Sequence, residues 1–360
     1  MQNQHWSARM ADSVMRRGVP FRWHYEYGLV HKAIEQVWLA TGDAQYYDYI
    51  KRDVDAFVGA EGDIQTYSVE EYNLDQIYPG RILFPLYRAT GDERYPKAAH
   101  LLREQLRGQP RIGEGGFWHK KIYPRQMWLD GIYMASPFYA EFGRTFGEPA
   151  AFDDVALQII LIEKHTRDPG TGLLYHAWDE GKQQPWANPQ TGCSPHFWGR
   201  AMGWYAMAIV DVLDYLPDDH ARRRDILAIF ERMAAALARV QDKATGLWRQ
   251  VLDQGGRAGN YLEASVSCMA VYSMAKAARR GIVAKTYLDV ARRGYAGILG
   301  NFIRIDEHGL VNLERTCGAA GLGGTPYRDG SYEYYTREKI VTNDYKGVGP
   351  FILASIEMEK

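Results

Sequence analysis

One carboxylate stands in a stretch that otherwise has the composition of a protein core. Asp130 belongs to the sequence MWLDGIYM, residues 127–134. Helical spacing would surround it with Gln126, Met127, Tyr133 and Met134. An ionised carboxylate is costly to bury alone. Either a partner therefore reaches Asp130 from elsewhere in the fold, or its raised proton affinity serves a reaction.

Asp75 is a second acid in an aromatic setting, within the sequence YNLDQIYPGR, residues 72–81. Two carboxyl groups whose surroundings push their pKa values apart can divide the roles of acid and base between them. The sequence does not show that Asp75 and Asp130 meet. Each could instead start a helix or form a salt bridge, so both interpretations stay open.

Arginine, histidine and tryptophan occur with aromatic rings in further segments. These are RWHYEYG (22–28), the stretch 119–130, LYHAWD (174–179) and SPHFWGRAMGW (194–204). Ser194 as N-cap and Pro195 at the first helical position predict where a helix begins. On that helix Arg200 and Trp204 would be neighbours, four residues apart. An arginine beside stacked aromatic rings suits a flat sugar that carries a carboxylate. A buried salt bridge between helices is the alternative for Arg200.

His176 also admits two interpretations, a catalytic group or a core histidine whose hydrogen bonds are satisfied. The pairs His24/His31 and His165/His176 are not spaced i,i+4, and no cluster of His, Cys and Asp has the spacing of metal ligands. We therefore expect no structural zinc and no cofactor.

Helical hairpins repeat along the chain. Three amphipathic stretches, 29–40, 81–89 and 137–145, end at a Gly that an acidic residue follows. This pattern is typical of one helix ending and the next beginning. Later pairs of helical segments cover 198–216 with 221–240, and 264–280 with 284–299.

Turns with a shared pattern separate the hairpins. Asp168, Asp242 and Asp306 each start an Asp-turn-Gly-Leu sequence that leads into a short extended segment. Six hairpins of about sixty residues would use up the chain. We therefore predict an all-α fold, an (α/α)6 barrel of six helical hairpins with short extended segments at one rim. Residues 1–360 are expected to form a single domain.

The composition excludes several classes of protein. Lys and Arg number 43 against 44 Asp and Glu, so no nucleic-acid or membrane surface is expected. The N-terminal sequence lacks the apolar region of a signal peptide, and no apolar run is long enough to span a bilayer. Cys193, Cys268 and Cys317 lie far apart and fit reduced, buried thiols. We expect a cytoplasmic monomer. The 10 Trp and 25 Tyr suit a sugar-stacking cleft as well as a large core.

Over nearly its whole length the sequence resembles glycoside hydrolase family 105, the unsaturated rhamnogalacturonyl hydrolases. The resemblance rests on WHYEYG, MWLDGIYMASPFYAEFG, YHAWDE, WANPQTGCSPHFWGRAMGWYAMA and the tail GLGGTPYRDGSYEYYTREKIVTNDYKGVGPFILASIEME. The FWGRAMGWY block and the GTPYRDGSYEYY part of the tail are the most specific. Members of this family are built on an (α/α)6 barrel, which agrees with the hairpin repeat.

The resemblance also implies a reaction. These enzymes hydrate the C4=C5 double bond that lyases leave on the uronic acid at the non-reducing end of pectin or rhamnogalacturonan fragments. A proton delivered to C4 gives an oxocarbenium-like C5, to which water adds. The product rearranges, the ring opens, and the aglycone, typically rhamnose, is released. A carboxyl in an apolar, aromatic pocket can hold the proton that this step needs.

Residue by residue, the resemblance implies roles for nine positions. Asp130 matches the general acid/base and Asp75 the second acid of the pocket. Substrate contacts are implied for Lys120, His176, Trp198, Arg200 and Trp204, and for either Tyr25 or Tyr27. The expected partner is a small oligosaccharide, such as an unsaturated uronyl-rhamnose disaccharide.

Three alternatives remain at this stage. The related family 88 unsaturated glucuronyl hydrolases use the same chemistry, but the FWGRAMGWY block and the tail argue against them. Sugar 2-epimerases work with histidine pairs, which these segments do not offer. A non-catalytic carbohydrate-binding barrel would have no use for an acid at position 130.

Overall fold

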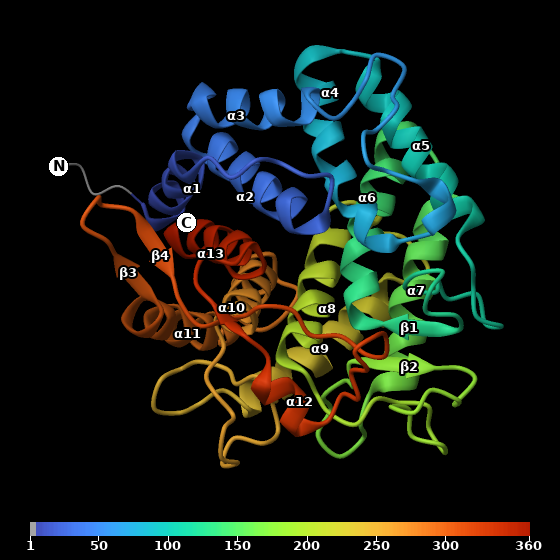
Figure 1. Cartoon of the computed structure of the whole chain (residues 1–360), viewed down its shortest axis with the longest axis vertical. Helices are drawn as coiled ribbons and strands as arrows, with labels where there is room; N and C mark the ends of the chain where they lie inside the picture. The colour runs from blue at the N-terminus through green and yellow to red at the C-terminus, as the bar shows by residue number, and fades with distance from the viewer. Residues whose placement is uncertain (1–4) are drawn as a thin grey trace.

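The inner helices of the protein form a closed ring. The computed structural model describes residues 5–360, so residues 1–4, part of the segment in which no signal peptide is predicted, lie outside the described residues. The ring consists of α2 (Tyr25–Thr41), the 3₁₀ helix η3 (Tyr78–Ile82) continued by α4 (Leu83–Thr90), α6 (Leu129–Phe146), α8 (Gly199–Val212), α10 (Ala264–Arg279) and α13 (Tyr345–Glu359). Each packs against the next, and α13 returns to α2 (Figure 1).

An outer layer of helices covers this ring. Its members are α1 (Trp6–Arg17), α3 (Ala44–Asp55), α5 (Arg94–Gly108), α7 (Ala150–Thr166), α9 (Arg223–Arg239) and α11 (Tyr287–Asn301). Each outer helix packs mainly against one inner helix, and α1, α5 and α11 also contact a neighbouring inner helix. The (α/α)6 barrel predicted from the hairpin repeat is therefore confirmed.

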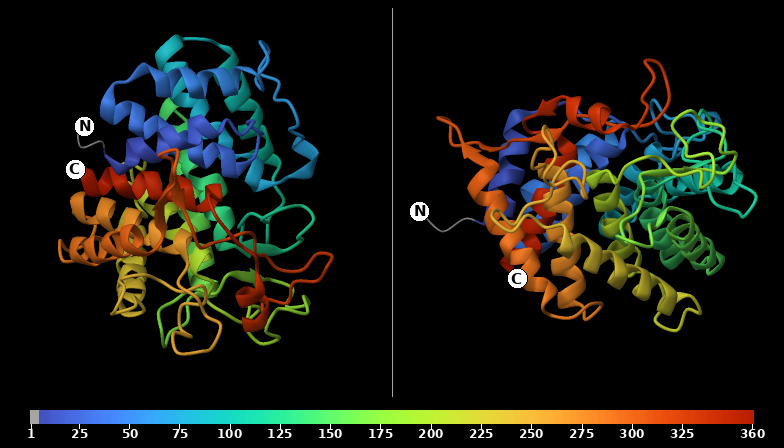
Figure 2. Two further views of the ribbon diagram at one scale, coloured as in Figure 1. Left: turned by 60° about the vertical axis from the view of Figure 1, so that its left-hand side comes forward. Right: turned by 90° about the horizontal axis from the view of Figure 1, so that it is seen from below.

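The sixth hairpin joins the two ends of the chain. Helix α1 packs against α13, and Figures 1 and 2 show them side by side. The Ser7 N–H donates to Glu359 at 3.1 Å, and the Ser7 hydroxyl donates to the other carboxylate oxygen at 2.5 Å. A repeat of hairpins adjacent in sequence could not reveal this pair, because its two helices are separated by most of the chain.

The predicted helix boundaries follow from local capping. Gly42 and Gly91 end α2 and α4 with φ angles of 71° and 66°, a left-handed conformation that favours glycine. The Asp43 carboxylate then accepts the Gln45 N–H at 3.0 Å and caps α3. These boundaries were readable from sequence because every partner lies within a few residues.

Short elements gather where the inner helices begin. They are η1 (Val69–Glu71), η2 (Leu74–Gln76), β1 (Gln126–Trp128), β2 (Ala177–Asp179), β3 (Ile303–Ile305), β4 (Val311–Leu313), β5 (Thr316–Cys317), α12 (Tyr332–Arg337) and β6 (Ile340–Val341). The strands pair antiparallel as β1–β2, β3–β4 and β5–β6. Because inner and outer helices alternate in direction, every connection from an outer to the next inner helix lies on the same rim.

The helix start predicted at Ser194 and Pro195 is wrong, because α8 begins at Gly199. Tertiary pairing competes with local capping there. The Ser194 hydroxyl oxygen accepts the Ala177 N–H at 3.2 Å, and Trp198 forms a β-bridge with Val251. Residues 194–198 therefore stay outside the helix.

A large hydrophobic cluster contains residues from both helical layers. A smaller cluster at the rim consists of Trp128, Ala177, Trp186 and Leu322. Within residues 5–360, no helix combines the length and the apolarity that crossing a membrane requires.

Candidate active site

The N-terminal ends of the inner helices bring the predicted site residues together. Tyr25 is the first residue of α2, and Asp130 and Arg200 are the second residues of α6 and α8. Asp75 lies in η2, just before η3. The partial positive charge at helix N-termini favours anionic groups, whether side chains or ligands. This rim is thus suited to holding carboxylates.

Asp130 has a partner that its own segment could not supply. Its Oδ2 atom lies 3.1 Å from Nε2 of His176, although the pair is not aligned as a hydrogen bond. His176 precedes β2, and its carbonyl accepts the Leu129 N–H at 3.1 Å. The pairing of β1 with β2 therefore sets the histidine against the acid. Gln126 and Met127, expected beside Asp130 on a helix, lie in β1 instead.

His176 is more deeply buried than Asp130. Its side chain is 0% exposed, whereas that of Asp130 is 14% exposed. Its other nitrogen, Nδ1, lies 2.8 Å from the hydroxyl of Tyr335 on α12. A substrate cannot touch a fully covered ring, so we interpret His176 as a positioning residue and not as the substrate contact expected from sequence.

Asp75 is held by a lysine and a histidine from one neighbouring loop. Lys120 donates to its Oδ2 at 2.5 Å, and His119 Nε2 lies 3.7 Å from Oδ1. Burial alone would raise the pKa of Asp75, but the charge and the hydrogen bond of Lys120 oppose burial, and the pKa is lowered. Burial lowers the pKa of His119 to about 4 against the attraction of Asp75, so this imidazole is neutral near pH 7. Asp75 is therefore an ionised carboxylate.

Lys120 remains accessible beside Asp75. Its side chain is 20% exposed, and the carboxylate of Asp75 raises its pKa although burial acts in the opposite direction. A β-bridge between Asn73 and Lys120 fixes the two segments relative to each other. A cation that is partly exposed next to a buried acid fits the predicted substrate contact.

Three nearly parallel rings form a wall beside the acids, the aromatic wall of His119, Tyr123 and Trp128. Trp128 stacks with His119 and with Tyr123 at centroid distances of 4.8 Å. Its edge also faces His176. Sequence reasoning did not single out Tyr123, Trp128 or Tyr335 as site residues. The aromatic residues between Lys120 and Asp130 were a signal for the first two, but nothing local pointed to Tyr335.

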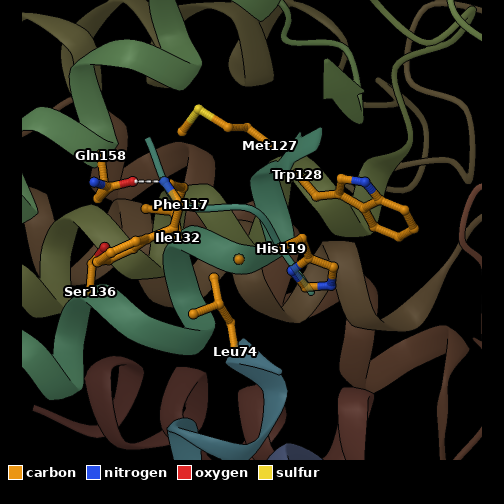
Figure 3. A pocket seen from close by; sticks show the side chains of 9 residues that line it. Leu74, Phe117, His119, Met127, Trp128, Ile132, Ser136 and Gln158 are labelled. Carbon is orange, nitrogen blue, oxygen red and sulfur yellow. Dashed lines mark hydrogen bonds between the residues drawn. The ribbon is translucent and has the colours of Figure 1, made fainter. Parts of the chain in front are cut away.

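A small cavity lies behind the aromatic wall (Figure 3). His119, Leu74, Ile132 and Trp128 are among its lining residues, and the Phe117 N–H donates to Gln158 at 2.7 Å on its far side. A Cβ at Gly131 would lie 3.0 Å from Nδ1 of His119. The glycine after Asp130 therefore leaves room for the imidazole that faces Asp75.

Arg200 is engaged in the protein's own structure. Its side chain is 1% exposed and donates to the Ser265 hydroxyl at 2.9 Å, to the carbonyl of Gly318 at 3.2 Å and to the carbonyl of Cys317. Glu263 lies 3.5 Å away as its counter-ion. These contacts favour the salt-bridge alternative over the expected contact with a substrate carboxylate.

The two tryptophans near Arg200 are also buried, at 1% exposure each. Trp198 donates to Gln250 at 3.2 Å, and Trp204 stacks on Tyr133 at 5.0 Å. Both rings therefore pack under the site, and an exposed stacking face for a sugar is not formed by either.

The two tyrosines left open by the sequence differ in their neighbours. Tyr25 is half-buried with its edge toward Trp204, and burial together with the charges of Glu26 and Asp75 raises its pKa. Tyr27 instead packs against Phe21 and Tyr345. Tyr25 is thus the one that faces Asp75.

The side chains that could bind a metal ion are those of His, Cys, Asp and Glu, and the three cysteines are among them. Among residues 5–360, no three His, Cys, Asp or Glu side chains are grouped so that they could hold a metal ion. Cys193, Cys268 and Cys317 are free and buried, as the sequence predicted.

Comparisons with known proteins show the family to which the chain belongs. The model of Glycosyl Hydrolase Family 88 matches residues 2–360, so the chain belongs to this family of glycoside hydrolases. A solved glycoside hydrolase of family 105 from C. acetobutylicum ATCC 824 is 47% identical, with a TM-score of 0.97 over 99% of both chains. The predicted membership of family 105 is therefore confirmed.

Two more distant relatives carry names of specific activities. The unsaturated rhamnogalacturonyl hydrolase YesR of Bacillus subtilis is 28% identical over 84% of this chain and 82% of its own. The unsaturated glucuronyl hydrolase of Bacillus sp. GL1 has a TM-score of 0.72 at 13% identity, over 98% of this chain and 95% of that one. The second likeness concerns the fold alone.

Proposed function

We propose that this glycoside hydrolase releases the 4,5-unsaturated uronic acid from the non-reducing end of lyase-generated rhamnogalacturonan or pectin fragments. The observation that carries the proposal is the difference between the surroundings of the two acids. Asp75 is fixed as a carboxylate by Lys120, whereas Asp130 is partly exposed and faces a histidine. The relation to YesR supports rhamnogalacturonan as the source of the substrate.

In the proposed reaction Asp130 is the general acid. It gives its proton to C4, and the electron pair of the double bond forms the new C–H bond. The positive charge that develops at C5 is shared with the ring oxygen, and water adds there. Asp130, now a carboxylate, takes the proton that this water loses. The resulting hemiketal opens, and the aglycone is released.

The surroundings of Asp130 fit the carboxylate stage of this cycle. The N-terminus of α6 stabilises a negative charge on its second residue, and His176 lies 3.1 Å from Oδ2. Hydrogen bonds that are poorly aligned without substrate commonly tighten when it binds. Asp75 would then orient Lys120 and the sugar, and Tyr25 would line the same side.

The proposal extends to the working form of the protein. We propose that residues 1–360 act as one catalytic domain, as a monomer in the cytoplasm, on a small oligosaccharide such as unsaturated uronyl-rhamnose. The free, buried state of the three cysteines supports a reducing compartment.

The first experiment follows the substrate's own chromophore. The double bond of an unsaturated uronate absorbs in the near ultraviolet, so hydration makes the signal fall. We expect this decrease with unsaturated uronyl-rhamnose, and no release of rhamnose from the saturated disaccharide. Comparable release from both sugars would instead indicate direct glycosidic cleavage, in which two carboxyl groups work about 5 Å or 6.5–9.5 Å apart. An unsaturated glucuronyl substrate from glycosaminoglycan, tested in parallel, addresses the family 88 alternative.

A further inference from the structure

The glycine-rich tail forms a strap across the rim. This C-terminal strap, residues 318–339, connects β5 to β6, and the pairing of these two strands holds its ends together. Figure 1 shows it in red, with α12 on it and its loop reaching toward β1 and β2. Leu322 is buried against Trp128 and Trp186. The strap is therefore packed onto the aromatic wall of the candidate site.

Arg328 is held on this strap by backbone contacts. Its N–H and carbonyl exchange hydrogen bonds with Gly323 at 3.2 and 2.8 Å. In its side chain, Nε donates to the Gly323 carbonyl at 2.9 Å, and Nη2 donates to the Leu322 carbonyl at 3.1 Å. Nη2 also donates to the Tyr123 hydroxyl at 2.9 Å. The guanidinium is thus fixed beside the aromatic wall.

The glycines of the strap make room for this cation. A Cβ at position 321 would lie 2.4 Å from Nη1 of Arg328, and one at position 324 would lie 3.2 Å from Nη2. A side chain at position 321 would therefore require the Arg328 guanidinium to move from this place. The sequence GLGG therefore has a packing function, which is to let the backbone enclose the Arg328 guanidinium.

The charge of Arg328 has no counter-ion in the described part of the protein. Within residues 5–360, no carboxylate oxygen lies within 4.0 Å of its nitrogens, and no acceptor is bonded to Nη1. The side chain is nevertheless half-buried. Its charge also acts to lower the pKa of Lys120, so both cations contribute to the positive field at this rim. A fixed, partly desolvated guanidinium without an acid is suited to an anionic ligand.

We propose that Arg328 binds a carboxylate of the oligosaccharide substrate and thereby selects acidic sugars. This inference rests on the hydrolase function proposed above. It transfers to Arg328 the role that the sequence suggested for Arg200, whose donors are occupied within the protein. Because Nε and Nη2 are already bonded, the carboxylate accepts from Nη1. Two sources are compatible with this chemistry, the terminal unsaturated uronate and a second uronate further along the chain.

The test removes the charge from the protein and from the ligand separately. Arg328→Gln is compared with wild type on unsaturated uronyl-rhamnose and on its methyl ester. A hydrogen bond to a charged group should make the KM for the acid rise about tenfold or more, because such bonds exceed the energy of a factor of ten. The KM for the ester and both kcat values should change little. Arg337→Gln, which removes an exposed arginine from the same strap, is the matched control and should behave as wild type.

A longer oligosaccharide with a second uronate separates the two sources. If Arg328→Gln already raises the KM for the disaccharide, Arg328 binds the terminal uronate. If the KM rises only for the longer oligosaccharide, Arg328 binds the second uronate. Equal losses on acid and ester, or an unchanged KM on every substrate, would overturn the proposal.

Two further measurements keep the outcome interpretable. If Arg328→Gln does not fold, Tyr123→Phe is the second variant, because it removes one hydrogen bond that holds the guanidinium. It should raise the KM for the acid more than the KM for the ester. Equal weakening would again count against Arg328. Turnover by wild type tests the hydrolase function by itself. In an inactive wild type, calorimetric binding of acid and ester to wild type and Arg328→Gln would still decide whether Arg328 recognises the carboxylate.

Discussion

The two ends of the barrel both bury acids among cations, but they do so differently. At the end opposite the candidate site, Asp211 of α8 accepts from Arg81 at 2.8 Å, Lys276 at 2.7 Å and Tyr272 at 2.6 Å. Burial raises the pKa of Asp211, but Lys276 and Arg81 outweigh it and hold the pKa far below its ordinary value. Both oxygens of this carboxylate have partners, although Nε of Arg81 forms no hydrogen bond with the described residues.

At the rim, polar atoms are left without aligned partners. Asp130 Oδ2, His176 Nε2 and His119 Nδ1 are buried but form no hydrogen bond, and Arg328 has no counter-ion among the described residues. Unsatisfied buried groups cost stability, so proteins retain them mainly where a ligand completes the bonding. The comparison suggests that the Asp211 end closes and stabilises the barrel, whereas the rim is organised for substrate.

The largest effect should come from the acid of the rim. Asp130→Asn keeps the shape of the side chain but removes the proton donor, so kcat should fall about 10²- to 10⁴-fold. The melting temperature should stay close to that of wild type. The control is Asp48→Asn, an exposed acid on α3 that should retain full activity. Near-normal turnover by a folded Asp130→Asn would move the acid role to another residue, with Asp75 the first to examine.

Asp211→Asn should have the opposite profile. It leaves Arg81 buried without its counter-ion and leaves Lys276 with Asp214 alone. Breaking a buried pair in this way typically costs about 3–5 kcal/mol of unfolding free energy. We expect a clear fall in melting temperature and, for the molecules that remain folded, an almost unchanged KM. Asp218→Asn removes an acid whose side chain is 96% exposed and should change stability little. A loss of activity without a loss of stability would contradict the division between the two ends.

Arg200→Lys tests whether Arg200 stabilises the barrel or binds the substrate. Lysine cannot replace three hydrogen bonds that diverge from one guanidinium, so stability should fall by about 1–3 kcal/mol. The KM for the unsaturated disaccharide should change little. Arg292→Lys, at a 61% exposed side chain on α11, is the control. A raised KM with an unchanged melting temperature would restore the substrate contact that the sequence suggested.

The smallest effect concerns acid stability. The folded pKa of Asp75 lies below its unfolded value of about 3.9. The ionised side chain therefore stabilises the fold above that value, and the contribution is lost as the pH falls through the folded pKa. Asp75→Asn should be less stable than wild type near pH 7, and the difference should narrow below about pH 4. Urea unfolding of both proteins across this pH range measures the difference in their unfolding free energies. A difference that stays constant with pH would show that Asp75 is not the titrating group.

The sequence determined whatever depends on neighbours along the chain. Capping at Gly42, Gly91 and Asp43 is local, so the helix boundaries and their repetition could be predicted, and with them the (α/α)6 barrel. The same holds for the family resemblance. An acid among aromatic residues is also visible in one segment, so the sequence could propose Asp75 and Asp130 as the two acids of the site.

Only the tertiary structure decided which groups meet across the rim. The histidine opposite Asp130 is placed by pairing of β1 with β2, and Tyr335 reaches that histidine from a position 159 residues further along the chain. The contacts of Arg200 and the unbonded Nη1 of Arg328 likewise depend on the strap that packs against the aromatic wall. Composition indicates which residues are able to do chemistry, but long-range packing determines which donors are already occupied and which remain available to a ligand.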